Sequence, residues 1–182
     1  MELSAQAKAG RLTREHFDWL MENPDRFDRN LGRFGRIHQI EVNYDLGLPG
    51  LIKAAKQNDV APDFNPTNFP LEGKGVRTVR LELYEFDRTV TGHEGWAIID
   101  ADGYQVEGPA ELCAFIALNR MAQLRRPIVA WKARWRNPRG EVYAPCAQQD
   151  GDEGPCLGFA LFELNFDPSW CVLVSRKPDL GQ

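Results

Sequence analysis

Residues 76–86, VRTVRLELYEF, decide the fold class, because their side chains alternate in character over the length of a strand. The apolar and polar members fall on opposite sides of an extended chain, with Val79, Leu81 and Leu83 on one side and Thr78, Arg80 and Glu82 on the other. This run predicts a strand of a sheet rather than a helix.

Working outward from this run, the same reasoning predicts further strands over 37–44, 96–99, 104–106, 128–136, 157–166 and 170–176. Residues 96–99 are apolar on both faces, which is typical of a central strand, and 104–106 are expected to return beside them as a hairpin arm. Capping residues and helical spacing predict helices over 13–22, 49–58 and 109–124. The polar positions of 109–124 span only half of its circumference, so this helix is expected to be largely covered.

Helices and strands do not alternate regularly, which argues against a parallel doubly wound sheet. The sequence therefore predicts an α+β fold: a mainly antiparallel sheet with one covered helix at about 109–124 and a partly helical N-terminal region. We expect residues 1–36 to form an N-terminal arm of helix and loop, and residues 37–182 to form one domain.

Composition excludes several classes of protein. Of the 182 residues, 43% are hydrophobic, which is ordinary for a globular domain, and no apolar run reaches the length of a membrane span. The net charge of −4 gives no general attraction to nucleic acid or to an anionic membrane. Residues 1–8 do not have the pattern of a signal peptide, so we expect a cytoplasmic protein with reduced cysteines, without a membrane partner.

The strongest local anomaly is residues 120–139, which hold seven basic residues and no acid. In a strand, Lys132, Arg134 and Arg136 share one face, and Trp131 and Trp135 lie on the other. With Arg125, Arg126 and Arg139, the basic face is a candidate for single-stranded nucleic acid. Base stacking needs aromatic rings on the charged side, so the spacing favours tryptophans in the core and a solvated basic face.

Two weaker constellations follow. Cys146 and Cys156 bracket Asp150, Asp152 and Glu153 in what is expected to be an acidic hairpin loop, and the spacing fits neither a zinc nor a calcium site. Residues 91–95 are expected to form a loop that places His93 beside Glu94, with Asp100 and Asp102 following, which is a candidate acid–base site. No phosphate loop, dinucleotide fingerprint or nucleophile elbow is present, and we expect no metal and no cofactor.

Short motifs recur in a fixed order along residues 37–177: Ile40-Glu-Val-Asn-Tyr44, Phe69-Pro70 with Gly73-Lys-Gly75, Leu83-Tyr-Glu-Phe86, Gly103-Tyr104 leading into Ala110-Glu-Leu-Cys-Ala-Phe115, Pro127-Ile-Val-Ala130 with Trp135, and Trp170-Cys-Val-Leu-Val-Ser-Arg-Lys177. This order resembles a group of small uncharacterised bacterial proteins whose C-terminal half is similar to C-type-lectin or formylglycine-generating-enzyme-like domains. The resemblance implies a fold that presents loops for binding.

The chain departs from that group at Val106-Glu107-Gly108, before the helix, and at Trp170-Cys171. The lectin calcium triplet and the paired C-terminal cysteines are missing, so neither calcium-dependent sugar binding nor oxidase chemistry is implied.

Together these observations favour a non-catalytic binding protein that recognises another protein through loops 137–156 and 165–170, including Asp150, Asp152 and Glu153. Binding of single-stranded nucleic acid through residues 120–139 is the alternative. A hydrolase or metal enzyme centred on His93 is the third.

Overall fold

The computed structural model describes residues 37–120, 122–150 and 154–178. The chain divides into two compact units, Met1–Ile37 and His38–Gln182, and the described residues belong, Ile37 apart, to the second. The predicted N-terminal arm and its helix over 13–22 lie outside the described residues.

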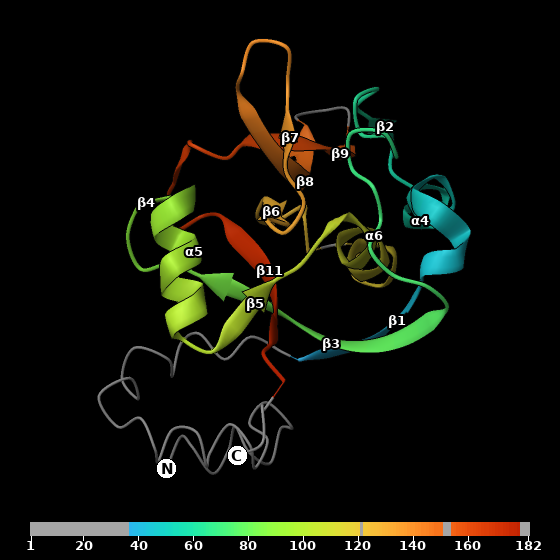
Figure 1. Ribbon diagram of the computed structural model, residues 1–182, viewed down its shortest axis with the longest axis horizontal. Helices are drawn as coiled ribbons and strands as arrows, with labels where there is room; N and C mark the ends of the chain where they lie inside the picture. The colour runs from blue at the N-terminus through green and yellow to red at the C-terminus, as the bar shows by residue number, and fades with distance from the viewer. Residues whose placement is uncertain (1–36, 121, 151–153, 179–182) are drawn as a thin grey trace. The chain divides into compact units, whose positions relative to one another are not determined.

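The elements follow one another as β1 (His38–Asn43), η2 (Tyr44–Leu46), α4 (Gly47–Ala55), β2 (Asp59–Val60), β3 (Val76–Glu85), β4 (Val90–Thr91), α5 (Gly92–Ala101), β5 (Tyr104–Val106), α6 (Pro109–Leu118), β6 (Ile128–Val129), β7 (Trp135–Arg136), β8 (Val142–Asp150), β9 (Gly154–Leu161), β10 (Asn165–Phe166) and β11 (Cys171–Arg176). Figure 1 shows their arrangement.

Within the described ranges, nine strands form one sheet in the order β1-β3-β11-β6-β8-β9-β2, with β5 on β11 and β7 on β8. The pairs β11–β6 and β2–β9 are parallel and the others are antiparallel. The strand predicted over 76–86 is β3, which lies between β1 and β11. The predicted α+β class with a mainly antiparallel sheet is confirmed.

Apolar side chains pack on both faces of this sheet, in two clusters. Leu81 and Leu173 point to the cluster that holds the buried residues of α4 and α6. Their strand neighbours Tyr84 and Val174 point to the other cluster, with Ile99 of α5. Figure 1 accordingly shows α5 and α6 on opposite sides of β11. The alternation predicted for β3 is therefore real. Its second face is exposed at Thr78 and Arg80, as predicted, but covered toward the end of the strand, where Glu82 and Tyr84 are buried.

Helix α6 is covered as predicted, with Pro109 and the seven residues after it buried. It ends at Leu118 rather than near 124, because Asn119 caps it: the side chain of Asn119 donates to the carbonyl oxygen of Phe115 at 3.0 Å. After this cap, residues 120 and 122–125 form turns before β6 begins.

Three other expectations are wrong. Residues 92–99, expected as a loop and a central strand, belong to α5, and β5 pairs with β11 rather than forming a hairpin with them. Residues 128–136 form β6 and β7 with an irregular segment between them. Most of the acidic loop expected between Cys146 and Cys156 is strand, because β8 and β9 form a long hairpin that pairs Cys146 with Gly158 and Gln148 with Cys156.

Helix α5 begins at Gly92 because the residue before it, Thr91, caps it. The hydroxyl of Thr91 accepts a hydrogen bond from the backbone N–H of Glu94 at 3.3 Å, in the Thr-x-x-Glu pattern of helix starts. Gly95 permits close packing, since a Cβ there would lie 2.8 Å from both Phe86 and Trp131. The glycines that suggested a loop are where the helix meets the core.

Candidate functional site at the start of helix α6

The site begins where two short strands converge on β11. Strand β5 runs antiparallel to β11 and ends opposite Val174, whereas β6 runs parallel to β11 and ends opposite Val172. Both therefore run toward Leu173, and the backbone N–H of Glu107 donates to the Leu173 carbonyl at 3.0 Å. Because the two strands run toward each other, neither can continue, and the chain leaves the sheet after Val106 of β5 and after Val129 of β6.

A bulge brings a basic residue to the same place. Residues 130–134 stand opposite only residues 144 and 145 of β8, so three extra residues leave the ladder. Within this bulge, the backbone N–H of Lys132 donates to the carbonyl oxygen of Glu107 at 3.0 Å. Lys132 and Glu107, 25 positions apart in the chain, are thereby fixed as neighbours.

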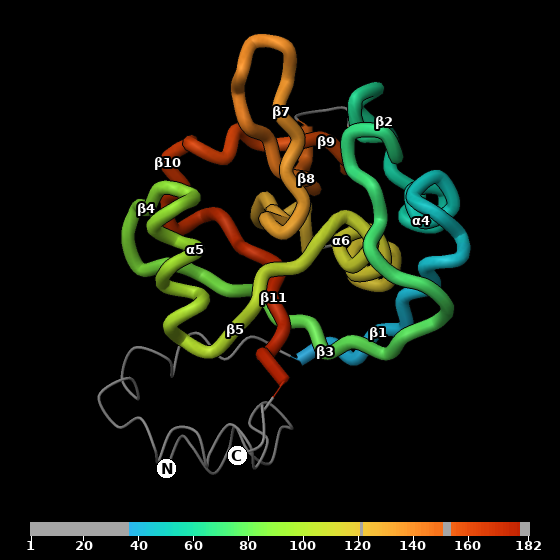
Figure 2. Tube along the Cα trace, viewed as in Figure 1, coloured from blue at the N-terminus to red at the C-terminus, as the bar shows by residue number. Residues whose placement is uncertain are grey.

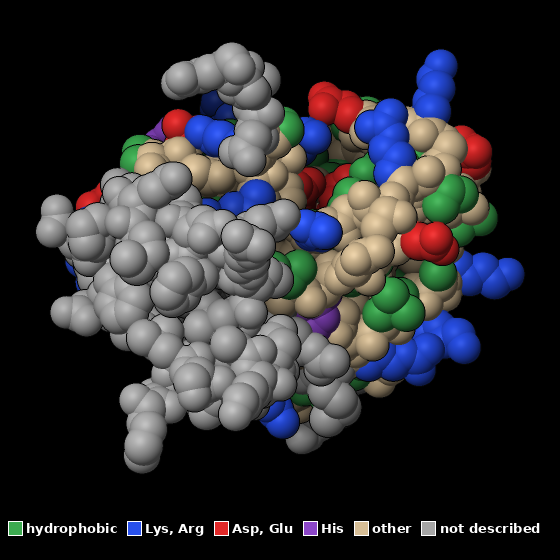
Figure 3. Space-filling view, turned by 90° about the horizontal axis from the view of Figure 1, so that it is seen from below, with side chains coloured by type: hydrophobic (Ala, Val, Ile, Leu, Met, Phe, Trp, Pro, Cys, Tyr) green, Lys and Arg blue, Asp and Glu red, His purple; other side chains and the backbone are tan. Residues whose placement is uncertain are grey.

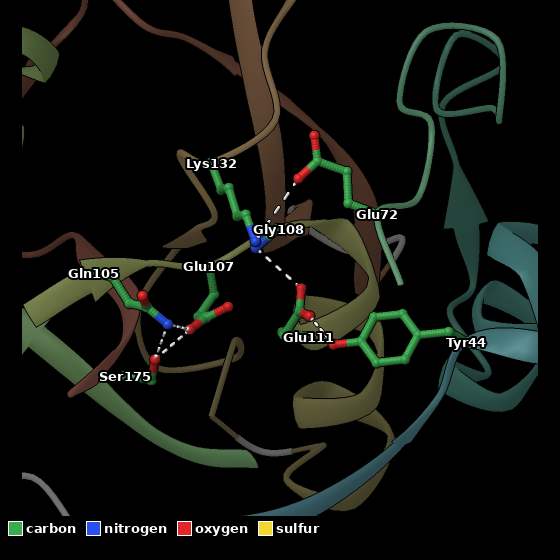
Figure 4. A network of polar contacts seen from close by, with 8 residues as sticks. All are labelled: Tyr44, Glu72, Gln105, Glu107, Gly108, Glu111, Lys132 and Ser175. Atoms are coloured by element: carbon green, nitrogen blue, oxygen red, sulfur yellow. Dashed lines mark hydrogen bonds and ion pairs between the residues drawn. The ribbon is translucent and has the colours of Figure 1, made fainter. Parts of the chain in front are cut away.

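Beside them lies a hollow of about 220 Å³, lined by Tyr44, residues of the 68–72 loop, residues 108–111 and residues 132–134. Gly73 fixes one wall of the hollow: it has a φ of 151°, and a Cβ there would lie 2.7 Å from the ring of Tyr44. The backbone at Gly73 is therefore packed closely on the tyrosine. Figure 4 shows the polar residues around this hollow.

Glu111 is the buried acid of the hollow, only 6% exposed. One carboxylate oxygen accepts from the backbone N–H of Gly108 at 3.1 Å, which caps α6, and the other accepts from the hydroxyl of Tyr44. Burial, followed by the bond to Glu111, raises the pKa of Tyr44, so its hydroxyl stays protonated and donates at neutral pH. Capping explains the first bond, whereas the second brings in a residue from η2.

Glu107 is the second buried acid, 5% exposed, and lies beside the first. Its Oε1 accepts from the hydroxyl of Ser175 and from Gln105 Nε2, the latter at 3.4 Å. Its Oε2 accepts no hydrogen bond from the described residues. Burial raises the pKa of Glu107 to about 6, and the charge of Glu111 adds to the shift while Ser175 and Lys132 oppose it.

The basic members are Lys132 and Arg134, both exposed at the edge of the hollow. In Figure 4 the amino group of Lys132 points toward Gly108, between Glu72 and the two buried acids, and it lies 3.9 Å from Glu72 Oε2. Opposite charges thus line one small space. Such an arrangement can orient a polar molecule, and the carboxyl group of Glu107, whose pKa is raised by burial, lies next to it.

The predicted basic residues are dispersed rather than gathered in one stripe. Arg126 pairs with Glu85 of β3 at 2.7 Å, and Arg136 donates to the carbonyl oxygen of Gly140. Arg125 and Arg139 are exposed on separate turns, and only Lys132 and Arg134 reach the hollow. Burial alternates as expected, with Trp131 fully buried and Trp135 packed against Phe69, Tyr143 and Phe159.

The other candidate residues lie elsewhere. Asp150 is exposed at the end of β8, and Asp152 and Glu153 lie outside the described residues. His93 lies edge-on to Phe162 at the start of α5, where Glu94 pairs with Arg88 at 2.6 Å.

Asp100 and Asp102 are at the far end of α5, about 10 Å along its axis from His93 and Glu94. Asp100 pairs with Lys177, and Asp102 accepts from the hydroxyl of Tyr84 at 2.5 Å. The helix therefore separates the acid–base candidates into two pairs rather than gathering them in one site.

Tyr44, Glu107, Glu111 and Ser175 were not singled out from the sequence as site residues. The pattern Gly108-Pro109-Ala-Glu111 does indicate a helix start with a capping glutamate. Nothing in the sequence pairs Glu111 with Tyr44, 67 positions away, or Glu107 with Ser175, 68 positions away. These pairs depend on the order of the strands.

Two further observations concern the described part of the chain. It contains no group of three or more His, Cys, Asp or Glu side chains arranged to hold a metal ion, and its four cysteines are buried and free. No helix within it is both long and apolar enough to cross a membrane.

A scan against protein-family models, a search of curated proteins and a search of solved structures each found no match to this chain. The resemblance to C-type-lectin-like and formylglycine-generating-enzyme-like domains therefore stays a prediction.

Proposed function

We propose that this chain is a binding protein for a small polar molecule, and that the hollow at the start of α6 is its ligand site. The observation that carries the proposal is an open space lined by the buried carboxylate of Glu111 and by Lys132, with the buried carboxylate of Glu107 next to that lining. Buried acids are costly, and a concave site where they converge with other polar groups is the usual setting for a ligand.

The size of the hollow limits the ligand. At about 220 Å³ it falls below the range of about 300–1,000 Å³ that is typical of sites for drug-sized molecules. Tyr44, Asn68 and the charged residues offer hydrogen-bonding groups, while Pro70, Leu71 and Ala133 offer apolar surface. A metabolite of modest size with several polar groups fits this lining.

A protein partner remains a prediction, but its candidate surface is smaller than the loops expected from the sequence. Much of 137–156 is strand, so two candidate segments for contact with a protein partner remain. One is the exposed turn after β7, which projects from the molecule in Figure 2, and the other is the segment 165–170. The charged side chains that the structure describes in these segments, Glu141 and Asp167 among them, are exposed rather than buried, so the hollow is the better supported site.

A thermal-unfolding screen tests the proposal. A ligand present at 100 times its Kd stabilises the folded state by about 2.7 kcal/mol, or roughly 5–10 °C for a chain of this size. The panel is a set of small polar metabolites in the classes of amino acids, sugars, amines, organic acids and phosphates. We expect at least one class to raise the Tm of the wild type.

A variant that fills the hollow shows where such a compound binds. Ala133→Leu places three carbon atoms at the hollow, and Ala97→Leu makes the same change on the exposed surface of α5. The shift in Tm should be lost in Ala133→Leu and kept in Ala97→Leu, with both variants folded by circular dichroism. A panel without any stabilising compound, or a shift that survives in Ala133→Leu, would overturn the proposal.

A further inference from the structure

Arg134 lines the hollow, and its guanidinium packs against two aromatic rings that lie outside this lining. Its guanidinium carbon lies 4.9 Å from the ring centroid of Trp96 on α5 and 4.9 Å from that of Phe162, which follows β9. Within the described residues, the guanidinium makes no ion pair and no hydrogen bond. A stacked guanidinium is fixed in orientation and weakly hydrated, so its N–H groups are ready for a planar anion.

Lys132 adds a second positive charge on the same side of the chain. The alternation through the bulge turns Trp131 inward and Lys132 and Arg134 outward. The only ion pair of Lys132 within the described residues is the one to Glu72 at 3.9 Å, and the Glu72 side chain is 80% exposed. Such an exposed, long pair contributes little, so Lys132 can exchange Glu72 for a ligand.

The hollow also has acidic lining, with Glu111 buried in it and Glu72 at its rim next to Lys132. Each oxygen of Glu111 accepts one hydrogen bond, and a carboxylate oxygen has room for another donor. With Glu72 at the rim and Glu107 beside Glu111, a dianion such as phosphate would meet repulsion from three carboxylates. A ligand with one negative and one positive group matches a lining that holds both charges.

We infer that the hollow recognises a small zwitterion of the α-amino-acid class. Its carboxylate binds Arg134 and Lys132, and its ammonium group lies against Glu111 and Glu72. This inference rests on the proposed function and specifies its ligand. Arg134 then acts as a binding residue for the carboxylate, held in position by Trp96 and Phe162.

Calorimetric titration with matched compounds tests the charge requirement. The probes are the L-amino acids, their methyl esters, which lack the carboxylate charge, and their N-acetyl derivatives, which lack the ammonium group. Removing a hydrogen-bonded charge from a ligand should weaken binding about 10- to 100-fold. We expect at least one amino acid to bind, and both of its derivatives to bind more weakly by this factor.

Variants of the arginine complete the test. The Arg134→Gln variant should bind the amino acid 10- to 100-fold more weakly than the wild type does. Its affinity for the methyl ester should be almost unchanged. Arg134→Lys keeps the charge but not the planar fork, so it should recover only part of the affinity. Arg139→Gln, an exposed arginine on the turn after β7, is the matched control and should bind like the wild type.

The outcomes separate this inference from the proposed function. Suppose that a sugar, an amine or inorganic phosphate binds and that Ala133→Leu abolishes this binding, while the amino acids bind no better than their derivatives. The inference of a zwitterionic ligand is then wrong, but the hollow remains a ligand site. If amino acids bind equally to wild type and Arg134→Gln, the role of Arg134 is wrong. If nothing binds, both fail.

Discussion

At the scale of single residues, the chain keeps acids where burial is expensive and compensates each with donors. Tyr44 and the backbone of Gly108 serve Glu111, and Ser175 serves Glu107. The compensation is incomplete for Glu107, whose pKa is raised to about 6 chiefly by burial. A residual cost of this kind is typical of functional sites rather than of helix caps.

This cost predicts how stability depends on pH. The folded-state pKa of Glu107 exceeds the ordinary value of 4.5, so the folded protein holds the proton more tightly than the unfolded chain. The contribution of Glu107 to the free energy of unfolding is fully present below pH 4.5. It is lost as the pH rises through 6, which lowers the free energy of unfolding by about 2 kcal/mol. Glu107→Gln stays neutral and still accepts from Ser175, so this part of the pH dependence should disappear.

Urea unfolding of both proteins at pH 4.5 and pH 7.5 measures the effect. The variant should gain about 2 kcal/mol relative to wild type between the two values. Glu163→Gln, which removes an exposed negative charge after β9, is the control and should show no comparable gain. An unchanged difference between wild type and Glu107→Gln at the two pH values would contradict the burial argument.

At the scale of elements, the sequence predicted long regular segments and failed where short-range pattern competes with tertiary packing. Period-two spacing correctly located β1, β3 and β11, and helical spacing located α4 and α6. The same rule read residues 96–99 as a strand, because four apolar residues in a row do not distinguish a strand from a buried helix. The rule also could not foresee the bulge at 130–134, since the burial of Trp131, Ala133 and Trp135 follows the pattern of a continuous strand.

The cap at the start of α5 predicts a loss of stability when the capping residue is changed. Thr91→Ala removes the hydroxyl that accepts from the Glu94 N–H, and loss of such a cap costs about 1 kcal/mol. Thr89→Ala, two residues earlier and exposed, removes a hydroxyl without a capping role and should change stability by less than about 0.5 kcal/mol. Chemical denaturation of the two variants decides the matter: equal stabilities would argue against a helix that starts at Gly92.

At the scale of the whole molecule, the ligand site depends on contacts between distant parts of the sequence. It needs β5 and β6 to meet on β11, η2 to follow β1, and the 68–72 loop to border the same hollow as Tyr44. The local sequence pattern does not predict these long-range contacts. The sequence therefore placed Lys132 and Arg134 in a basic stripe and gave no sign that they border a hollow. Charge is likewise distributed: acidic and basic side chains intermix over the described part of the face in Figure 3.

This distribution predicts weak binding of nucleic acid. Trp131 is fully buried, Arg126 is paired with Glu85, and the net charge is −4. A 20-mer single strand should therefore bind no more tightly than about 10⁻⁶ M, and added salt should abolish the binding. Submicromolar affinity at physiological salt that Arg134→Glu removes would instead support the basic residues of 120–139 as a nucleic-acid site.

The most direct test of the ligand site is a nuclear magnetic resonance titration of ¹⁵N-labelled protein with the tightest-binding compound of the metabolite panel. We predict that the largest backbone amide shifts fall at Tyr44, at residues 108, 110 and 111, and at residues 132–134, which border the hollow. Shifts confined to residues 137–141 and 165–170, or the absence of shifts around α6, would contradict the account.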